Sequence, residues 1–252
     1  MALGEYYKIS NVHRADSLRH IILRESRSFE DSIRFNALFY NAEIAEIIGD
    51  QDEYFRTILA CQPFLNKLNS DDIRTKLFRH LGYYHSSMQE YETADFYFNQ
   101  AIKLAQKNKS NAMLSEIYSH LALNFMSMNA KDSSLFYAGK SINSARRAKD
   151  KSVLSIAVNT QARIYDFFGQ IELSVAKNLI SLQLAEEARN IWLLAKYTRE
   201  IGRDQKIILN LKDAEYYFRR SLGYAQQIHD ERQMGLALTN LAALQLDRKN
   251  FS

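Results

Sequence analysis

Apolar and small residues recur along this chain at spacings of three and four, the period that gives a helix one buried face. The clearest stretch predicts two helices on either side of a turn at 88–91. Their facing residues are Phe78, Leu81, Gly82 and His85 on the first helix and Ala94, Phe98 and Ala101 on the second. The small residues allow the helices to approach closely, and Phe98 fills the adjoining space. The pattern predicts an antiparallel helix hairpin.

The hairpin pattern returns along the chain at a constant long interval. A small residue marks each return, at Gly82, Ala122, Ala162, Gly202 and Ala242. On the second helices it continues as Ser134, Ala138 and Ser141, as Ser174, Asn178 and Ser181, and as Ala214, Phe218 and Ser221. A fixed long period is the signature of stacked helical repeats. The unit at 151–190 departs from the pattern, because Asn178 replaces an expected bulky residue.

Repeat units are predicted near 1–30, 31–70, 71–110, 111–150, 151–190 and 191–230, with an incomplete unit at 231–252. Together they predict a single repeat domain over 1–252. Ala2 falls in the middle of a first helix. The last unit has a helix near 236–246 and a turn around Lys249–Asn250, without a second helix. Solenoids normally finish with a polar capping element, so we expect this chain to be a piece of a longer protein.

Three local features add to this prediction. Pro63 falls late in a predicted second helix and should kink or restart it, because an interior proline costs about 3 kcal/mol. Cys61, the only cysteine, is interpreted as a small core residue. Asp71 and Asp72 are predicted to cap a helix and to complement its dipole.

These residues resemble the tetratricopeptide repeat (TPR) family, whose units carry Leu-Gly on the first helix and Ala, Phe and Ala on the second. The match is best over 78–101 and extends to essentially the whole chain. The resemblance implies an all-α, right-handed superhelical solenoid of antiparallel helix hairpins. The units are longer than is usual in the family. Long units of this kind are similar to those of bacterial peptide-sensing regulators and of the sensor regions of bacterial kinases and transcription factors.

Composition agrees with an all-α protein. Among 252 residues there are 8 Gly and 1 Pro, both of which helix interiors reject. No stretch approaches the roughly 20 apolar residues of a membrane span. Nothing requires an oxidising compartment, so a cytoplasmic location is favoured over a periplasmic sensor region. The net charge of +4 is too small to indicate nucleic acid, and acidic residues (Glu116, Asp166 and Glu200) interrupt the basic stripe.

The sequence carries no recognisable catalytic or cofactor motif. It lacks the P-loop, the HExxH and CxxC metal and redox patterns, and the GxSxG nucleophile turn. His80, His120 and Glu116 have residue types that bind metals, but they are interpreted as polar residues on adjacent first helices. We therefore expect a non-enzymatic protein with no catalytic residue, cofactor or metal.

Binding is better supported than catalysis. The resemblance implies that first helices line a concave groove. The groove-facing positions nominate a peptide-binding set: Lys76, Arg79, Tyr83, Leu123, Asn159, Arg163, Lys196, Arg199, Arg203 and Lys206. Its cations gather toward the C-terminal units, so the groove is expected to hold an acidic or carboxylate-bearing segment, with arginine giving bidentate contacts. Asn159 is expected to hold the peptide backbone.

Other interpretations remain open. The cations can equally be solvated charges paired with neighbours such as Glu200. We expect a protein- or peptide-binding scaffold, the sensory or interaction region of a bacterial signalling or transcriptional regulator. The alternatives are an adaptor that self-associates, forming a homo-oligomer, and an accessory domain that acts on a phosphorylated signalling partner. Gln161 and Gln205 are at packing positions and do not supply that activity.

Overall fold

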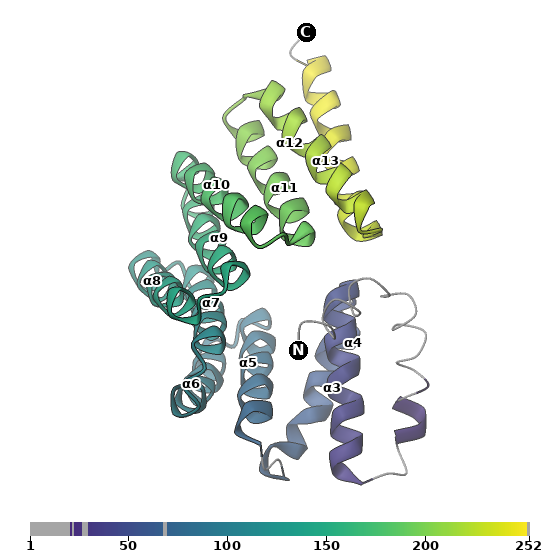
Figure 1. Ribbon diagram of the computed structural model, residues 1–252, viewed down its shortest axis with the longest axis vertical. Helices are drawn as coiled ribbons and strands as arrows, with labels where there is room; N and C mark the ends of the chain where they lie inside the picture. The colour runs from purple at the N-terminus through teal and green to yellow at the C-terminus, as the bar shows by residue number, and fades with distance from the viewer. Residues whose placement is uncertain (1–20, 22, 27–29, 68–69, 251–252) are drawn as a thin grey trace. The chain divides into compact units, whose positions relative to one another are not determined.

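A computed structural model of the protein describes residues 21, 23–26, 30–67 and 70–250. Within these ranges the regular structure is entirely helical (Figure 1). The helices are α3 (Asp31–Ile48), α4 (Gln51–Cys61), η2 (Gln62–Lys67), α5 (Asp71–Ser87), α6 (Tyr91–Lys107), α7 (Asn111–Ser127), α8 (Lys131–Ala148), α9 (Lys151–Phe167), α10 (Ile171–Glu187), α11 (Ile191–Ile207), α12 (Leu211–Gln227) and α13 (Glu231–Asn250).

These helices form consecutive antiparallel hairpins. The first helices begin at positions 31, 71, 111, 151, 191 and 231, and the second helices at 51, 91, 131, 171 and 211. Both series keep the constant step that the small residues predict. The chain divides into two compact units, Met1–Lys109 and Ser110–Ser252, here called unit 1 and unit 2. A single domain over 1–252 stays a prediction.

Each hairpin closes on a small residue of its first helix. Gly82 of α5 and Gly202 of α11 face Phe98 and Phe218 of the following helices. A Cβ atom added to either glycine would lie 2.6 Å from the phenylalanine ring. Where the first helix carries alanine instead, at Ala122 and Ala162, the facing position holds Ala138 or Asn178, and all four of these residues are buried. Glycine therefore faces phenylalanine, whereas alanine faces a smaller residue.

The fifth small residue does not follow this rule. Gly82, Ala122, Ala162 and Gly202 are buried as predicted, but Ala242 is exposed. Buried neighbours on α13 are instead Ala237 and Leu244, and Leu244 packs with Ala214 and Phe218. Among the described residues no helix follows α13 to pair with it, so Ala242 lacks the partner that buries its counterparts.

Short connections join most of the helices, each with one residue in the left-handed conformation. These residues are Gly49, Gln89, Lys109, Asn129, Lys149, Gly169, Arg189, Leu209 and His229. After α5, for example, the amide of Gln89 donates to the carbonyl of Ser86 and the amide of Glu90 to that of His85. This pair of bonds satisfies free carbonyl groups at a helix end. Because the connections are so alike, successive helices start at equal intervals along the chain.

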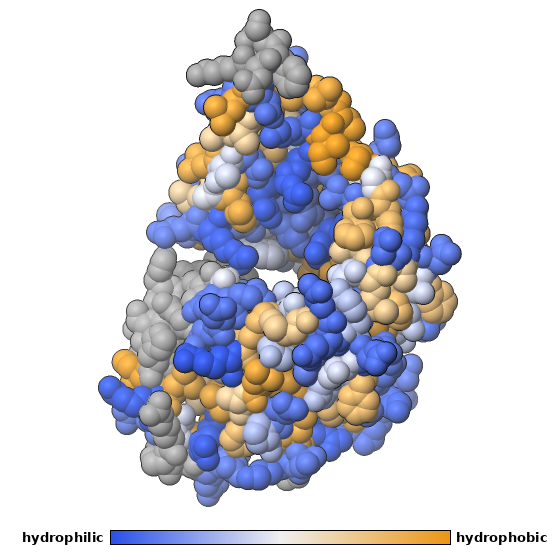
Figure 2. All heavy atoms as spheres, turned by 180° about the vertical axis from the view of Figure 1, so that it is seen from behind, coloured by the Kyte–Doolittle hydropathy of each residue, from blue (hydrophilic) through white to orange (hydrophobic). Residues whose placement is uncertain are grey.

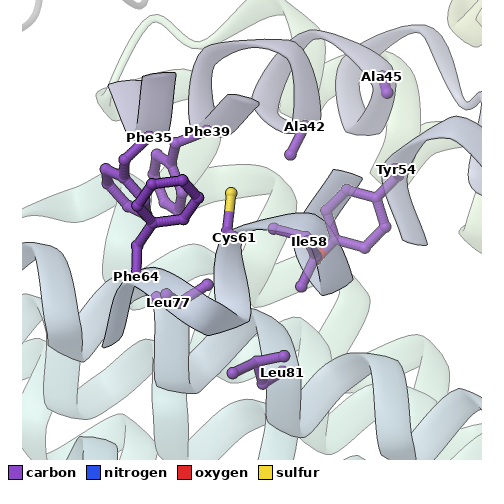
Figure 3. Close-up of a cluster of buried hydrophobic side chains, with 10 residues drawn as sticks. All are labelled: Phe35, Phe39, Ala42, Ala45, Tyr54, Ile58, Cys61, Phe64, Leu77 and Leu81. Carbon is purple, nitrogen blue, oxygen red and sulfur yellow. The ribbon is translucent and has the colours of Figure 1, made fainter. Parts of the chain in front are cut away.

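The core of unit 1 confirms two local predictions (Figure 3). Its side chains are Phe35, Phe39, Ala42, Ala45, Tyr54, Ile58, Cys61, Phe64, Leu77 and Leu81. Cys61 is fully buried, and burial raises the pKa of its thiol to about 12. α4 ends at Cys61 and the 3₁₀ helix η2 begins at Gln62, one residue before Pro63, because proline has no amide hydrogen to continue the ladder.

Two end predictions were wrong. The N-cap of α5 is Ser70, whose Oγ accepts from the amide of Ile73, and not Asp71 or Asp72. Both aspartates lie in the first helical turn, where their charges complement the helix dipole as predicted. Lys249 and Asn250 form no turn, because α13 continues to Asn250. Ala2 lies outside the described residues.

Candidate binding surface on the first helices of unit 2

Within unit 2 the first helices form one layer. α7 contacts α9, α9 contacts α11, and α11 contacts α13. The second helices α8, α10 and α12 reach the following hairpin through its first helix. First helices thus lie closer together than second helices, and unit 2 is concave on the side of its first helices.

The repeat period aligns predicted site residues across this inner layer. Leu123, Arg163 and Arg203 occupy the same position on α7, α9 and α11. Leu123 is half-buried, and the two arginines are exposed. Asn159 and Arg199 occupy a second shared position, one turn earlier on α9 and α11. The structure therefore brings five of the predicted residues onto neighbouring helices of one unit.

The cationic side chains of α9 and α11 lie close enough to affect one another's pKa values. Burial lowers the pKa of Lys196, as do the neighbouring charges of Arg163 and Arg199, while Glu200 opposes the shift. Burial also lowers the pKa of Arg199, whose Nε atom is buried without a hydrogen-bond partner. Arg163 and Arg203 form no ion pair with any residue that the structure describes. This positive charge is only partly neutralised within the protein.

A chain of hydrogen bonds lies beneath these cations. Asn159 is 1% exposed, and its amide group donates to Glu200 Oε2 and, at 2.9 Å, to Asn178 Oδ1. Asn178 in turn donates to Asp204 Oδ2 at 3.0 Å. Ser174 Oγ donates to the same oxygen at 2.8 Å. The network joins α9, α10 and α11 and fixes the Glu200 carboxylate beside the cations.

Asp204 is the buried end of this network and is 3% exposed. Burial raises the pKa of its carboxyl group to about 6, against the hydrogen bonds from Ser174 and Asn178, and the charges of Asp166 and Glu200 raise it further. Burial of a carboxylate without a cationic partner is costly. The folded chain therefore favours the neutral, protonated form of the Asp204 carboxyl group.

The remaining predicted residues are already engaged within the protein or lie outside unit 2. In unit 1, Arg79 is buried and its Nη2 lies 2.8 Å from His80 Nε2. Tyr83 is half-buried and its hydroxyl lies 3.5 Å from the amide nitrogen of Gln51. Lys76 is half-buried on α5. In unit 2, Lys206 forms an ion pair with Asp247 of α13 at 2.8 Å.

Sequence reasoning missed Asp204, Ser174 and Arg232. The sequence did flag Asn178 as a departure from the repeat, and this residue is the centre of the network. Asp204, its acidic partner on the next helix, could not be assigned from spacing alone. Arg232, at the start of α13, lies close enough to Arg199 for its charge to act on the Arg199 pKa.

Two features are absent from the part of the chain that the structure describes. No three or more His, Cys, Asp or Glu side chains gather there as a metal site. His80 instead lies with its Nδ1 atom 2.6 Å from the Tyr54 hydroxyl. No described helix has both the length and the apolar character that crossing a membrane requires.

Comparison with known proteins finds likeness in structure alone. No family model and no curated protein matches the sequence. A Rap protein complexed with competence and sporulation factor aligns with a TM-score of 0.78 at 9% identity, over 87% of this chain and 61% of that one. NprR in complex with its cognate peptide NprX aligns with a TM-score of 0.73 at 12% identity, over 94% and 70%.

A third similar structure is BtubC from P. vanneervenii, with a TM-score of 0.59 at 14% identity over 87% of this chain and 93% of that one. The chain has a TPR-like fold. At these identities the likeness establishes the arrangement of helix hairpins and leaves the ligand to the residues of this chain.

Proposed function

We propose that this chain is a non-enzymatic, cytoplasmic scaffold that binds an acidic or carboxylate-bearing peptide segment on the first helices of unit 2. It would serve as the sensory or interaction region of a bacterial signalling or transcriptional regulator. The observation that carries the proposal is the surplus of cations on α9 and α11. Arg163, Lys196, Arg199 and Arg203 share one inner layer, and Glu200 is the carboxylate whose charge acts on both Lys196 and Arg199.

Two further observations support this proposal. The inner layer is concave, so a bound segment can contact several helices at once and lose more water than on a flat surface. Two of the similar structures, the Rap protein and NprR, contain a bound factor or peptide. Asn159 was expected to bind the peptide backbone, but it is buried and donates hydrogen bonds to Glu200 and Asn178. We propose that it positions the side chains of the binding surface and does not contact the segment.

The test is calorimetric titration of the full chain with a peptide of alternating glutamate and glycine. The double variant R199E/R203E reverses two charges in the middle of the surface, and we expect it to weaken binding by at least about tenfold. Circular dichroism should show unchanged helicity, because Arg203 is exposed and Arg199 is half-buried. Wild-type binding should also weaken steeply with added salt.

The matched control is K212E/R219E, which makes the same change in charge on exposed positions of the second helix α12. It should bind as the wild type does. Equal loss in both double variants would mean that net charge and not this surface attracts the peptide, and the proposal would then be wrong.

A second candidate function is self-association, and one observation favours it. Ile207, Ile208 and Leu209 follow one another at the end of α11 with exposed fractions of 53%, 43% and 69%. Figure 2 shows strongly apolar patches of this kind on the surface. Sedimentation of the wild type over a range of concentrations separates the two functions, since a self-associating adaptor gains mass with concentration.

A further inference from the structure

The arginine cluster at the junction of α11 and α13 has three guanidinium groups, against two carboxylates, Glu200 and Asp230, whose charges act on Arg199. Arg199 and Arg203 are one turn apart on α11, and Arg232 lies in the first turn of α13. The two helices are in contact. Arg203 and Arg232 both act as like charges on Arg199. Three guanidinium groups from two contacting helices are therefore close enough for their charges to interact.

The carboxylates near these arginines already interact with other groups. Glu200 accepts a hydrogen bond from Asn159 and also lies beside Lys196. Asp230 caps α13, since its Oδ1 accepts from the amide of Gln233 at 2.9 Å. Both carboxylates attract Arg199, yet its buried Nε–H group still has no acceptor. A buried donor without a partner is costly, and an acceptor on a bound segment would satisfy it.

We propose that this cluster, formed by Arg199, Arg203 and Arg232, binds a phosphoryl group carried by a side chain of the bound segment. A phosphoryl group carries a charge of about −1.5 to −2 at pH 7 and three acceptor oxygens, whereas a carboxylate carries one charge. It can therefore meet several guanidinium groups at once, including the Nε–H of Arg199. Arg163, which is exposed, remains available for a carboxylate of the same segment.

This inference rests on the proposed function and adds the chemistry of the ligand to it. The test uses the full chain labelled with ¹⁵N and three peptides of the sequence Gly-Xaa-Glu-Gly. Xaa is phosphoserine, serine or glutamate. Arginine Nε–Hε resonances and backbone resonances of α9 and α11 are followed during each titration, and inorganic phosphate alone is a fourth titrant.

We expect the phosphoserine peptide to bind at least about tenfold more tightly than the other two peptides and to shift the Arg199 Nε–Hε resonance. R232Q should remove that preference. The matched control is R219Q on α12, where Arg219 is exposed and already paired with Glu215, and it should keep the preference.

The outcomes separate the two proposals. Equal binding of all three peptides, with shifts on α9 and α11, overturns the phosphoryl site and leaves the proposed function standing. Binding of inorganic phosphate as tight as that of the phosphoserine peptide also overturns it, because the segment would then add nothing. If no peptide shifts α9 or α11 at millimolar concentration, the proposed function itself is wrong.

Discussion

Asp204 and Asn178 are polar side chains in the layer where equivalent residues of neighbouring hairpins are apolar. Asn178 occupies the place that Phe98 and Phe218 fill in other units, and both phenylalanines are fully buried. Its amide group satisfies Asp204 on one side and Asn159 on the other. A chain of polar groups inside a helical core is retained only when its members are hydrogen-bonded, and this one links the core to the surface charges.

Asp204 makes stability depend on pH. The pKa of its carboxyl group is about 6 in the folded chain and 3.8 as the reference for the unfolded chain. Between these values the folded chain binds a proton that the unfolded chain does not. The free energy of unfolding from this group therefore rises as pH falls through 6 toward 4, and above pH 6 the ionised group destabilises the fold.

The variant D204N removes this dependence. Its melting temperature should exceed that of the wild type at pH 8, and the advantage should shrink at pH 5, where the wild-type carboxyl group is mostly neutral. Thermal melts by circular dichroism at both pH values measure the difference. An equal change at both pH values would show that Asp204 does not titrate in this range.

At the scale of elements, the contact between paired helices is set by a match in size. Gly82 and Gly202 each allow a phenylalanine ring to lie on the backbone of the first helix. Helices in such close contact gain packing along their length, and this offsets the cost of glycine inside a helix, about 0.5–1 kcal/mol relative to alanine. The repeated left-handed connections then place each hairpin at the same step from the last.

Gly202→Ala should destabilise the protein by about 1–3 kcal/mol, since the added Cβ would overlap the Phe218 ring and force it from its position. Gly223→Ala is the matched control on the partner helix α12, where an added Cβ meets nothing within 4 Å. It should stabilise the protein by about 0.5–1 kcal/mol through helix propensity. Urea unfolding of both variants measures these changes, and a stabilising Gly202→Ala would refute the size match.

The elements were largely predictable from sequence because each helix repeats the same small-residue and apolar spacing. The exceptions have local causes. Ala242 is exposed since no described helix packs against it, and the turn near Lys249 was inferred from a repeat that α13 does not follow. The site was predictable in part: Arg163, Arg199 and Arg203 align through the period, but Asp204 and Arg232 join them through contacts between helices that spacing does not encode.

At the scale of the whole molecule, the chain separates two tasks within unit 2. Buried residues from both layers hold the hairpins together, such as Tyr197 on a first helix and Phe218 and Asn178 on second helices. The first helices form a concave layer whose exposed positions are free to carry charge. In a scaffold of this kind, substitutions at a few positions of the inner layer change which ligand is bound, while the packing residues stay the same.

The central claim is that a bound acidic segment lies on the inner layer of unit 2. Photo-crosslinking tests it most directly, with benzoylphenylalanine placed in separate variants at Leu123 on α7 and at Phe136 on α8. Leu123 shares its position with Arg163 and Arg203, whereas Phe136 is 58% exposed on a second helix. The account predicts that the glutamate peptide crosslinks to the variant at 123 and not to the variant at 136. Crosslinking at 136 with none at 123 would contradict it.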